Sequence, residues 1–435
     1  MAHVRTRLSL VEYGTPVDLS KAISMAIGVD RAKSTQLLME AGSRAAANLN
    51  LSYNPIHVDG SGVRALDFAG LIRLAPSLEL EVAPKFLAPG KHDATWREDF
   101  FFLSTLSRHG RLLGNERLAA SSGVPRDLST LVARCIVGMY EARKRRPLRS
   151  YRKTIEADFF IDGDPDPTDL IFPGPDGFEQ EVIKFDRRND WNSNIAAAAK
   201  ELLPEVRDPQ AAASLVRIIE DLAPQGPRQP RLKPIPARHR AWKPLHELSI
   251  DILNGLGVNY RMGQAHAPGY LVTTWRVWED LITLGAKLGF GVAAVLPQKG
   301  FSLGNRIRTV AGAGKTVLSV YPDCVIEPGG TRPRMLLDAK YKGHSERGNL
   351  RISEADIYEG MAFARATDCN CLVLVYPALP SAVIKPVGTC TAFERVEIGE
   401  VRIVGVQVES RTISKSGALQ SFASTMSKEL AALFS

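Results

Sequence analysis

Hydrophobic residues recur at helical spacing in some parts of the chain and at alternate positions in others, and this change of period outlines its elements. In the first half, segments 64–86 and 154–167 contain strand-like runs, and the alternation in 78–82 ends at Pro84. Helical spacing is found in three segments of the same half: 20–50 with a break at Gly28, 127–146 and 192–203. We therefore expect this half to mix helices and strands.

The second half alternates more regularly between the two periods. Its strand-like segments are rich in β-branched and apolar residues and cover 316–327, 334–341, 369–377 and 401–410. Helical spacing is found in 245–257, 275–290, 353–366 and 424–434. Because helices are interspersed among the strands, the predicted fold class is α/β (α+β), with a central mixed sheet flanked by helices in this half.

A segment rich in proline and arginine separates the two halves. Residues 223–244 show no apolar periodicity, and proline removes backbone donors and favours extended conformations. The predicted organisation is therefore an N-terminal region 1–222, a linker 223–244 and a C-terminal domain 245–435.

Composition narrows the class of protein only a little. Of 435 residues, 45% are hydrophobic and 23% charged, which is typical of a globular chain. No apolar run of about 18 residues indicates a membrane span, and the N-terminus lacks the apolar core of a secretory signal. Five scattered cysteines favour a reducing compartment, so we expect a cytoplasmic protein. The net charge of +8 agrees with a phosphate-rich partner without identifying one.

The stretch Gly312–Thr316 resembles the end of a phosphate-binding loop, but its surroundings exclude that site. The motif needs a glycine where this chain has Thr309, and the loop must open a helix whose amides bind phosphate. The residues after Thr316 are β-branched and interrupted by Pro322, which predicts a strand. We therefore expect a hairpin turn here and no nucleotide bound by this chain.

A set of acids and a lysine in the same half indicates a different chemistry. Asp323 begins an apolar strand, Asp338 and Lys340 lie two apart and so share a strand face, and Glu279 lies on a predicted helix. Carboxylates can gather Mg²⁺ for phosphodiester hydrolysis, and a lysine can stabilise the developing charge. Asp323, Asp338, Glu279 and the carbonyl oxygen of Ala339 are the candidate ligands. The alternative is an ordinary salt bridge between Asp338 and Lys340.

These residues give the second half a resemblance to the PD-(D/E)xK nucleases. Segments 277–282, 321–327, 335–343 and 355–366 carry the resemblance, and the whole chain resembles the McrC family, the nuclease subunit of McrBC-type restriction systems. In that family the helix after the Asp-x-Lys strand usually carries Asp-x-Tyr-Gln. Here it reads Asp356, Tyr358 and Glu359, so the glutamine is replaced and the role of Glu359 is open. Tyr358 is expected to pack with its hydroxyl near the site.

The resemblance implies a function for the whole chain. It implies a Mg²⁺-dependent DNA endonuclease subunit of a McrBC-like anti-phage restriction complex, with Mn²⁺ as a substitute metal. It also implies an AAA+ GTPase or ATPase ring as partner, engaged by residues 1–222, and double-stranded DNA as substrate. The alternative is a non-catalytic adaptor, with a degenerate nuclease fold, that activates or anchors the partner.

Basic residues outside the acidic set are candidates for contact with DNA or the partner. The densest group lies at the end of the helix 127–146 and just after it, where a solvated helix end is the simpler explanation. The candidates are Arg145, Arg146, Arg149, Arg152 and Lys153, together with Lys85 after Pro84.

Overall fold

The computed structural model describes most of the chain and divides it into two compact units. The described residues are 6–75, 77–87, 96–109, 128–206, 208–222, 233–253, 270–307, 314–327, 335–341, 345–346, 349–378 and 383–433. One unit comprises Val4–Ser122 with Leu271–Ser435, and the other comprises Met1–His3 with Gly123–Tyr270. Helices and mixed sheets together confirm the predicted α/β (α+β) class.

The first sheet of the larger unit has the strand order β1-β5-β4-β9. β1 (Thr6–Val11) runs parallel to β5 (Leu78–Ala83), and β4 (Phe68–Ala75) runs antiparallel to β5. Also in this part are β9 (Tyr270–Thr273), α1 (Ser20–Ile27), α2 (Arg31–Leu49), α3 (Trp96–His109) and the hairpin of β2 (Ile56–Asp59) and β3 (Gly62–Ala65). The predicted helix break at Gly28 is confirmed, because this residue ends α1 in a left-handed conformation with φ of 69°.

Strand β5 departs from the one-sided burial that its alternating sequence predicts. All six residues are buried, including Glu79 and Glu81. Glu79 accepts a hydrogen bond from Arg7 at 3.1 Å, and Arg97 donates to both oxygens of Glu81 at 2.7 and 2.5 Å. Ion pairing allows the acids to be buried, so their polarity did not indicate a solvent-exposed face.

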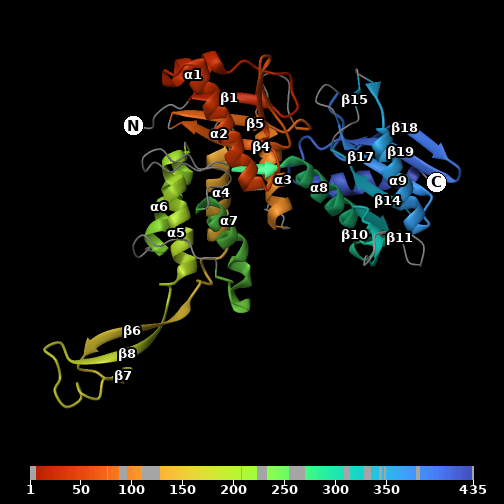
Figure 1. Ribbon diagram of the computed structural model, residues 1–435. Coiled ribbons are helices and arrows are strands. Elements are labelled where there is room, and N and C mark those ends of the chain that lie inside the picture. Colours follow the sequence, from red (N-terminus) through yellow and green to blue (C-terminus); the bar gives the residue numbers. More distant parts are fainter. Residues whose placement is uncertain are drawn as a thin grey trace. The chain divides into compact units, whose positions relative to one another are not determined.

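The second sheet of the larger unit has six strands in the order β10-β13-β14-β17-β19-β18. They are β10 (Val295–Pro297), β13 (Cys324–Ile326), β14 (Met335–Ala339), β17 (Cys371–Pro377), β19 (Val401–Val408) and β18 (Cys390–Ile398). The central strands β14, β17 and β19 are parallel, and the outer pairings are antiparallel. The predicted mixed sheet is therefore present, and Figure 1 shows it in teal and blue.

Three helices accompany this sheet: α8 (Thr274–Phe290), α9 (Glu354–Thr367) and α10 (Ala418–Ala432). Phe363 of α9 lies in the same buried cluster as Leu372 of β17 and Ile403 of β19. Gly360 brings α9 close to the sheet, since a Cβ there would lie 2.5 Å from a methyl group of Leu372. Short segments complete the unit: the 3₁₀ helix η4 (Val292–Ala294) and the pair β15 (Ser345–Glu346) and β16 (Asn349–Leu350).

The segment 316–327 forms two strands and not the single strand expected. β12 (Lys315–Val320) pairs with β11 (Phe301–Ile307) in a separate hairpin, whereas β13 belongs to the six-stranded sheet. Pro322 lies between them, and its lack of an N–H group interrupts sheet pairing. The residues after Thr316 form a strand, as expected, and the glycine at 312 lies outside the described residues.

The smaller unit consists mainly of helices and one long hairpin. Its helices are α4 (Leu128–Glu141), α5 (Asp190–Leu202), α6 (Pro209–Leu222) and α7 (Lys243–Leu253), with the 3₁₀ helices η2 (Leu203–Glu205) and η3 (Ala237–Trp242). Its strands β6 (Ser150–Asp158), β7 (Asp164–Pro165) and β8 (Phe178–Asp186) form a three-stranded sheet in the order β6-β8-β7. In Figure 1 this hairpin projects from the helices of its own unit.

The compact units are divided differently from the predicted regions 1–222, 223–244 and 245–435. Residues 4–122 belong with 271–435, because β9 pairs with β4 and Asp99 of α3 accepts hydrogen bonds from Thr412 and Ser414. Residues 223–232 of the predicted linker lie outside the described residues. The roles assigned to the predicted regions stay predictions. Within the described ranges, no helix combines the length and apolar character needed to cross a membrane.

Candidate active site

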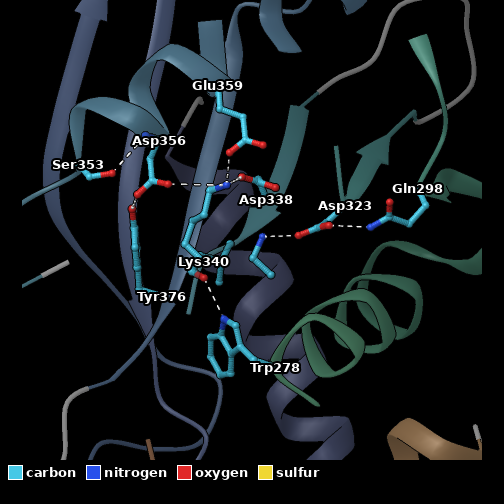
Figure 2. Close-up of polar contacts among 11 residues, drawn as sticks. Trp278, Gln298, Asp323, Asp338, Lys340, Ser353, Asp356, Glu359 and Tyr376 are labelled. Carbon is cyan, nitrogen blue, oxygen red and sulfur yellow. Dashed lines mark hydrogen bonds and ion pairs between the residues drawn. The ribbon is translucent and has the colours of Figure 1, made fainter. Parts of the chain in front are cut away.

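The predicted acids lie on three neighbouring elements of the larger unit. Glu279 lies on α8, Asp323 directly precedes β13, and Asp338 lies near the end of β14. The helix is fixed to the sheet by Trp278, which is fully buried and donates from Nε1 to the carbonyl oxygen of Val375 at 3.0 Å. Because Glu279 follows Trp278, this bond also sets where its carboxylate can lie. Figure 2 shows the group around Asp338 and Lys340.

Asp323 is held by hydrogen bonds from two sides. Its Oδ2 accepts from the backbone N–H of Ala339 at 2.8 Å, which ties it to the end of β14. Its Oδ1 accepts from the side-chain amide of Gln298 at 2.7 Å, and the same amide donates to Glu279 at 2.8 Å. Gln298 therefore bridges two of the predicted acids, and Figure 2 shows its contact with Asp323.

Sequence analysis did not identify Gln298. It has φ of 48°, a left-handed conformation that is uncommon for residues other than glycine. Its backbone N–H donates to the carbonyl oxygen of Asp323 at 3.0 Å, so the strained turn is held in place. No spacing rule links a glutamine after Pro297 to acids 19 residues before and 25 residues after it.

Lys340 lies among three acids. Its Nζ is 2.6 Å from Asp338 Oδ2 and donates a hydrogen bond to Glu359 Oε2 at 2.6 Å. Asp356 Oδ1 lies further away, at 3.7 Å. Asp338 Oδ2 is buried, and the ammonium of Lys340 is its ion-pair partner. Glu359, whose role the sequence left open, contacts the lysine in this structure.

Helix α9 presents Asp356 to the site by a local hydrogen bond at its start. Ser353 is the N-cap, and its Oγ accepts from the backbone N–H of Asp356 at 3.1 Å. Tyr376 of β17 donates from its hydroxyl to Asp356 Oδ2 at 3.0 Å. Tyr358 was expected to pack, but its side chain is 70% exposed, because it lies on the outer side of α9.

Burial and mutual repulsion raise the proton affinity of the acids. Burial raises the pKa of Asp338 to about 7, against the attraction of Lys340, and the charge of Asp323 adds to the rise. Burial and then Glu279 raise the pKa of Asp323 to about 6. Burial also raises the pKa of Glu279, which the Gln298 hydrogen bond partly offsets. One lysine and one amide therefore do not balance the negative charge gathered here.

The side chains of this site can be compared with the ligands that a divalent cation requires. Among the described residues, no three acidic, histidine or cysteine side chains already form a metal-binding group. The donors are nevertheless hard oxygen ligands of the kind that Mg²⁺ takes, and their pKa values are raised by burial first and by the charge of a neighbouring acid second. Asp338 Oδ2 is buried, and among the described residues it is charge-paired only with Lys340, at 2.6 Å. These features fit a cation held by Asp323 and Asp338.

The basic residues predicted to contact DNA or the partner differ in exposure and in ion pairing. Arg145, Arg146 and Arg149 are exposed, but Arg152 pairs with Asp186 at 3.3 Å and Lys153 pairs with Glu181 at 2.5 Å along the β6–β8 hairpin. Lys85 is half-buried, and its ammonium donates to the carbonyl oxygen of Tyr341. Contact of these residues with DNA or a partner stays a prediction.

Two solved structures resemble the whole or part of this chain. A structure from Thermococcus gammatolerans, a half-complex of McrB AAA+ hexamers with bound McrC, aligns over 98% of this chain and 100% of its own chain, with 14% identity and a TM-score of 0.64. A second structure, of the Thermococcus gammatolerans McrBC complex, covers 63% of this chain and 85% of its own at 15% identity, with a TM-score of 0.46. The first likeness shows a shared fold. No curated protein matches the chain in sequence.

A family model assigns the chain more specifically. The model for the McrBC 5-methylcytosine restriction system component matches residues 63–377. This range is more than half of the chain and spans Glu279, Asp323, Asp338 and Lys340. The chain therefore belongs to the family of McrBC 5-methylcytosine restriction system components.

Proposed function

We propose that this chain is the Mg²⁺-dependent DNA endonuclease subunit of a McrBC-like restriction complex. The observation that carries the proposal is the meeting of Asp323, Asp338 and Lys340 where β13 begins and β14 ends. Two carboxylates and a lysine at adjacent strand ends form the constellation expected of PD-(D/E)xK nucleases. Membership of a restriction-system family makes DNA the polymer with which such a site would act.

Each residue has a defined task in this proposal. Asp323 and Asp338 hold the metal, with the carbonyl of Ala339 and the carboxylate of Glu279 as further ligands. Bound Mg²⁺, or Mn²⁺ in its place, supplies charge neutralisation at the phosphate and activates water. Lys340, kept cationic because Asp338 and Glu359 raise its pKa more than burial lowers it, stabilises charge that develops on phosphate oxygens. Asp356 and Glu359 hold the ammonium in place.

The partner in this proposal is an AAA+ ring of McrB type. The Thermococcus gammatolerans structure is described as McrC bound to McrB hexamers, and we extend this arrangement to the present chain. The β6–β8 hairpin offers a docking surface, because its side chains include Phe159, Phe160, Ile161, Ile171 and Phe172 at 55 to 78% exposure. Clustered exposed apolar residues are characteristic of protein contact surfaces.

The proposal is tested by DNA cleavage with the complex of this chain and its McrB-type partner. Wild type and Asp338→Asn are compared on methylated plasmid DNA with Mg²⁺ and nucleotide. We expect Asp338→Asn to abolish cutting while the complex still assembles and hydrolyses nucleotide. Equal cutting by both would assign the chemistry elsewhere. Stimulated hydrolysis without cutting by wild type, on any DNA offered, would favour the non-catalytic adaptor.

A further inference from the structure

A buried acid that is not itself a candidate metal ligand contacts the first residue of α8 and the chain just after β14, two of the elements that carry those ligands. Glu12 follows β1 and is 1% exposed. Its Oε1 accepts a hydrogen bond from the hydroxyl of Thr274, the first residue of α8, at 2.5 Å. Its Oε2 accepts a hydrogen bond from the hydroxyl of Tyr341, which lies two residues beyond the end of β14. One carboxylate thus joins the start of α8 to the chain just after Lys340.

Lys85 and Phe86 strengthen the same connection. The ammonium of Lys85 donates to the carbonyl oxygen of Tyr341 and lies 4.4 Å from the centre of its ring. Phe86 is 2% exposed, and its ring centre lies 5.7 Å from that of Trp278 and 5.8 Å from that of Tyr341. Trp278 directly precedes Glu279, and Tyr341 directly follows Lys340.

A buried carboxylate costs more free energy than a contact that merely joins two elements would require. Burial of the Glu12 carboxylate raises its pKa to about 7, although Thr274, Tyr341 and Lys85 all favour the charged form. An apolar side chain of similar volume would join the same elements without this penalty. Apolar packing permits small sliding motions between the elements that it joins. Hydrogen bonds are directional, so the two that Glu12 accepts from hydroxyl groups fix the position of α8 relative to the chain after β14.

We infer that Glu12, together with Lys85, Phe86, Thr274 and Tyr341, is a positioning group that sets the distance between the metal-binding carboxylate on α8 and those on β13 and β14. This inference rests on the proposed nuclease function. None of its members is a proposed metal ligand, and Lys85, which the sequence also predicts as a contact for DNA or the partner, is not altered in the test below. Its effect should therefore appear as weaker metal binding, with the ligands themselves unchanged.

Two conservative variants test the inference. Tyr341→Phe removes one hydroxyl and keeps the ring against Phe86 and Lys85, and Glu12→Gln keeps the shape of the acid. The matched control is Glu81→Gln, which alters an equally buried acid of the first sheet that pairs with Arg97 and Arg7. Calorimetry measures Mg²⁺ binding to each isolated chain, and urea unfolding measures stability. Cleavage by the complex with its partner is measured against Mg²⁺ concentration.

We expect Tyr341→Phe and Glu12→Gln to weaken Mg²⁺ binding and to raise the Mg²⁺ concentration for half-maximal cutting about tenfold, the lower end of losses from residues that orient metal ligands. Glu81→Gln should lose stability without either change. Unchanged Mg²⁺ binding in both test variants, or an equal change in the control, would refute a positioning role. If wild type neither binds Mg²⁺ nor cuts DNA, the proposed nuclease function fails and the inference falls with it.

Discussion

Asp338→Asn should make the metal-free protein more stable while it removes the proposed activity. Asp338 is 5% exposed, and its pKa rises from 3.8 to about 7 on folding. Each pKa unit corresponds to about 1.4 kcal/mol, so keeping the Asp338 carboxylate charged in the folded protein costs about 4 kcal/mol of folding free energy. The asparagine avoids that cost but brings an amide whose incomplete hydrogen bonding costs about 1–3 kcal/mol. We therefore expect a net gain of about 1–3 kcal/mol at pH 8.

The pH dependence follows from the direction of the shift. Because the pKa is raised in the folded state, the wild-type protein loses stability as pH rises from the unfolded value of 3.8 through about 7. The variant does not titrate at this position. Its advantage over wild type should therefore be small at pH 5 and full at pH 8.

The assay must report on the larger unit, because two compact units need not unfold together. Native-state hydrogen exchange of β14 and β17 amides, at pH 5 and pH 8 in EDTA, measures the opening free energy of this sheet. Added Mg²⁺ should stabilise wild type and not the variant, because only wild type has both proposed carboxylate ligands. Glu409→Gln is the contrasting control. Burial raises the pKa of Glu409, but the hydrogen bonds and charge of Arg411 outweigh burial and lower it. Losing this charge should therefore destabilise the sheet at pH 8.

Two outcomes would refute the electrostatic argument. The first is an Asp338→Asn protein less stable than wild type at pH 8 without metal. The second is a stability difference that is the same at pH 5 and pH 8, which would point to packing and not to charge.

Two further predictions concern the docking hairpin and the contact between helices. The double variant Phe160→Ser and Phe172→Ser should weaken binding of the McrB-type partner at least tenfold, as measured by calorimetry, and leave Mg²⁺ binding unchanged. If the variant binds the partner as tightly as wild type does, the hairpin is not the docking surface. Gly289→Ala should destabilise the larger unit by about 1–3 kcal/mol in urea unfolding, because a Cβ there would lie 2.5 Å from the carbonyl oxygen of Ala423 on α10. Gly138→Ala in α4 meets open space and should stabilise by about 0.5–1 kcal/mol; a loss there comparable to that at Gly289 would contradict the steric argument.

Sequence alone predicted several of the elements and named the acids that the structure brings together. Periodicity placed α8, α9, β14 and β17, and Gly28 marked the end of α1. The Asp-x-Lys spacing correctly predicted that Asp338 and Lys340 share a face, because alternate residues of a strand always do. The strand after Thr316 was likewise predictable from its β-branched residues. These are local properties that a short stretch of chain decides by itself.

The tertiary structure decided what each element contacts. Glu79 and Glu81 appear in the sequence as residues of a half-exposed strand and are buried because Arg7 and Arg97 reach them. Gln298 joins the site only through a left-handed turn between two separate sheets. Glu12 meets Tyr341 across 329 positions. Periodicity reports which way a side chain points relative to its own backbone, whereas partners this distant are set by how sheets and helices pack, which no local pattern encodes.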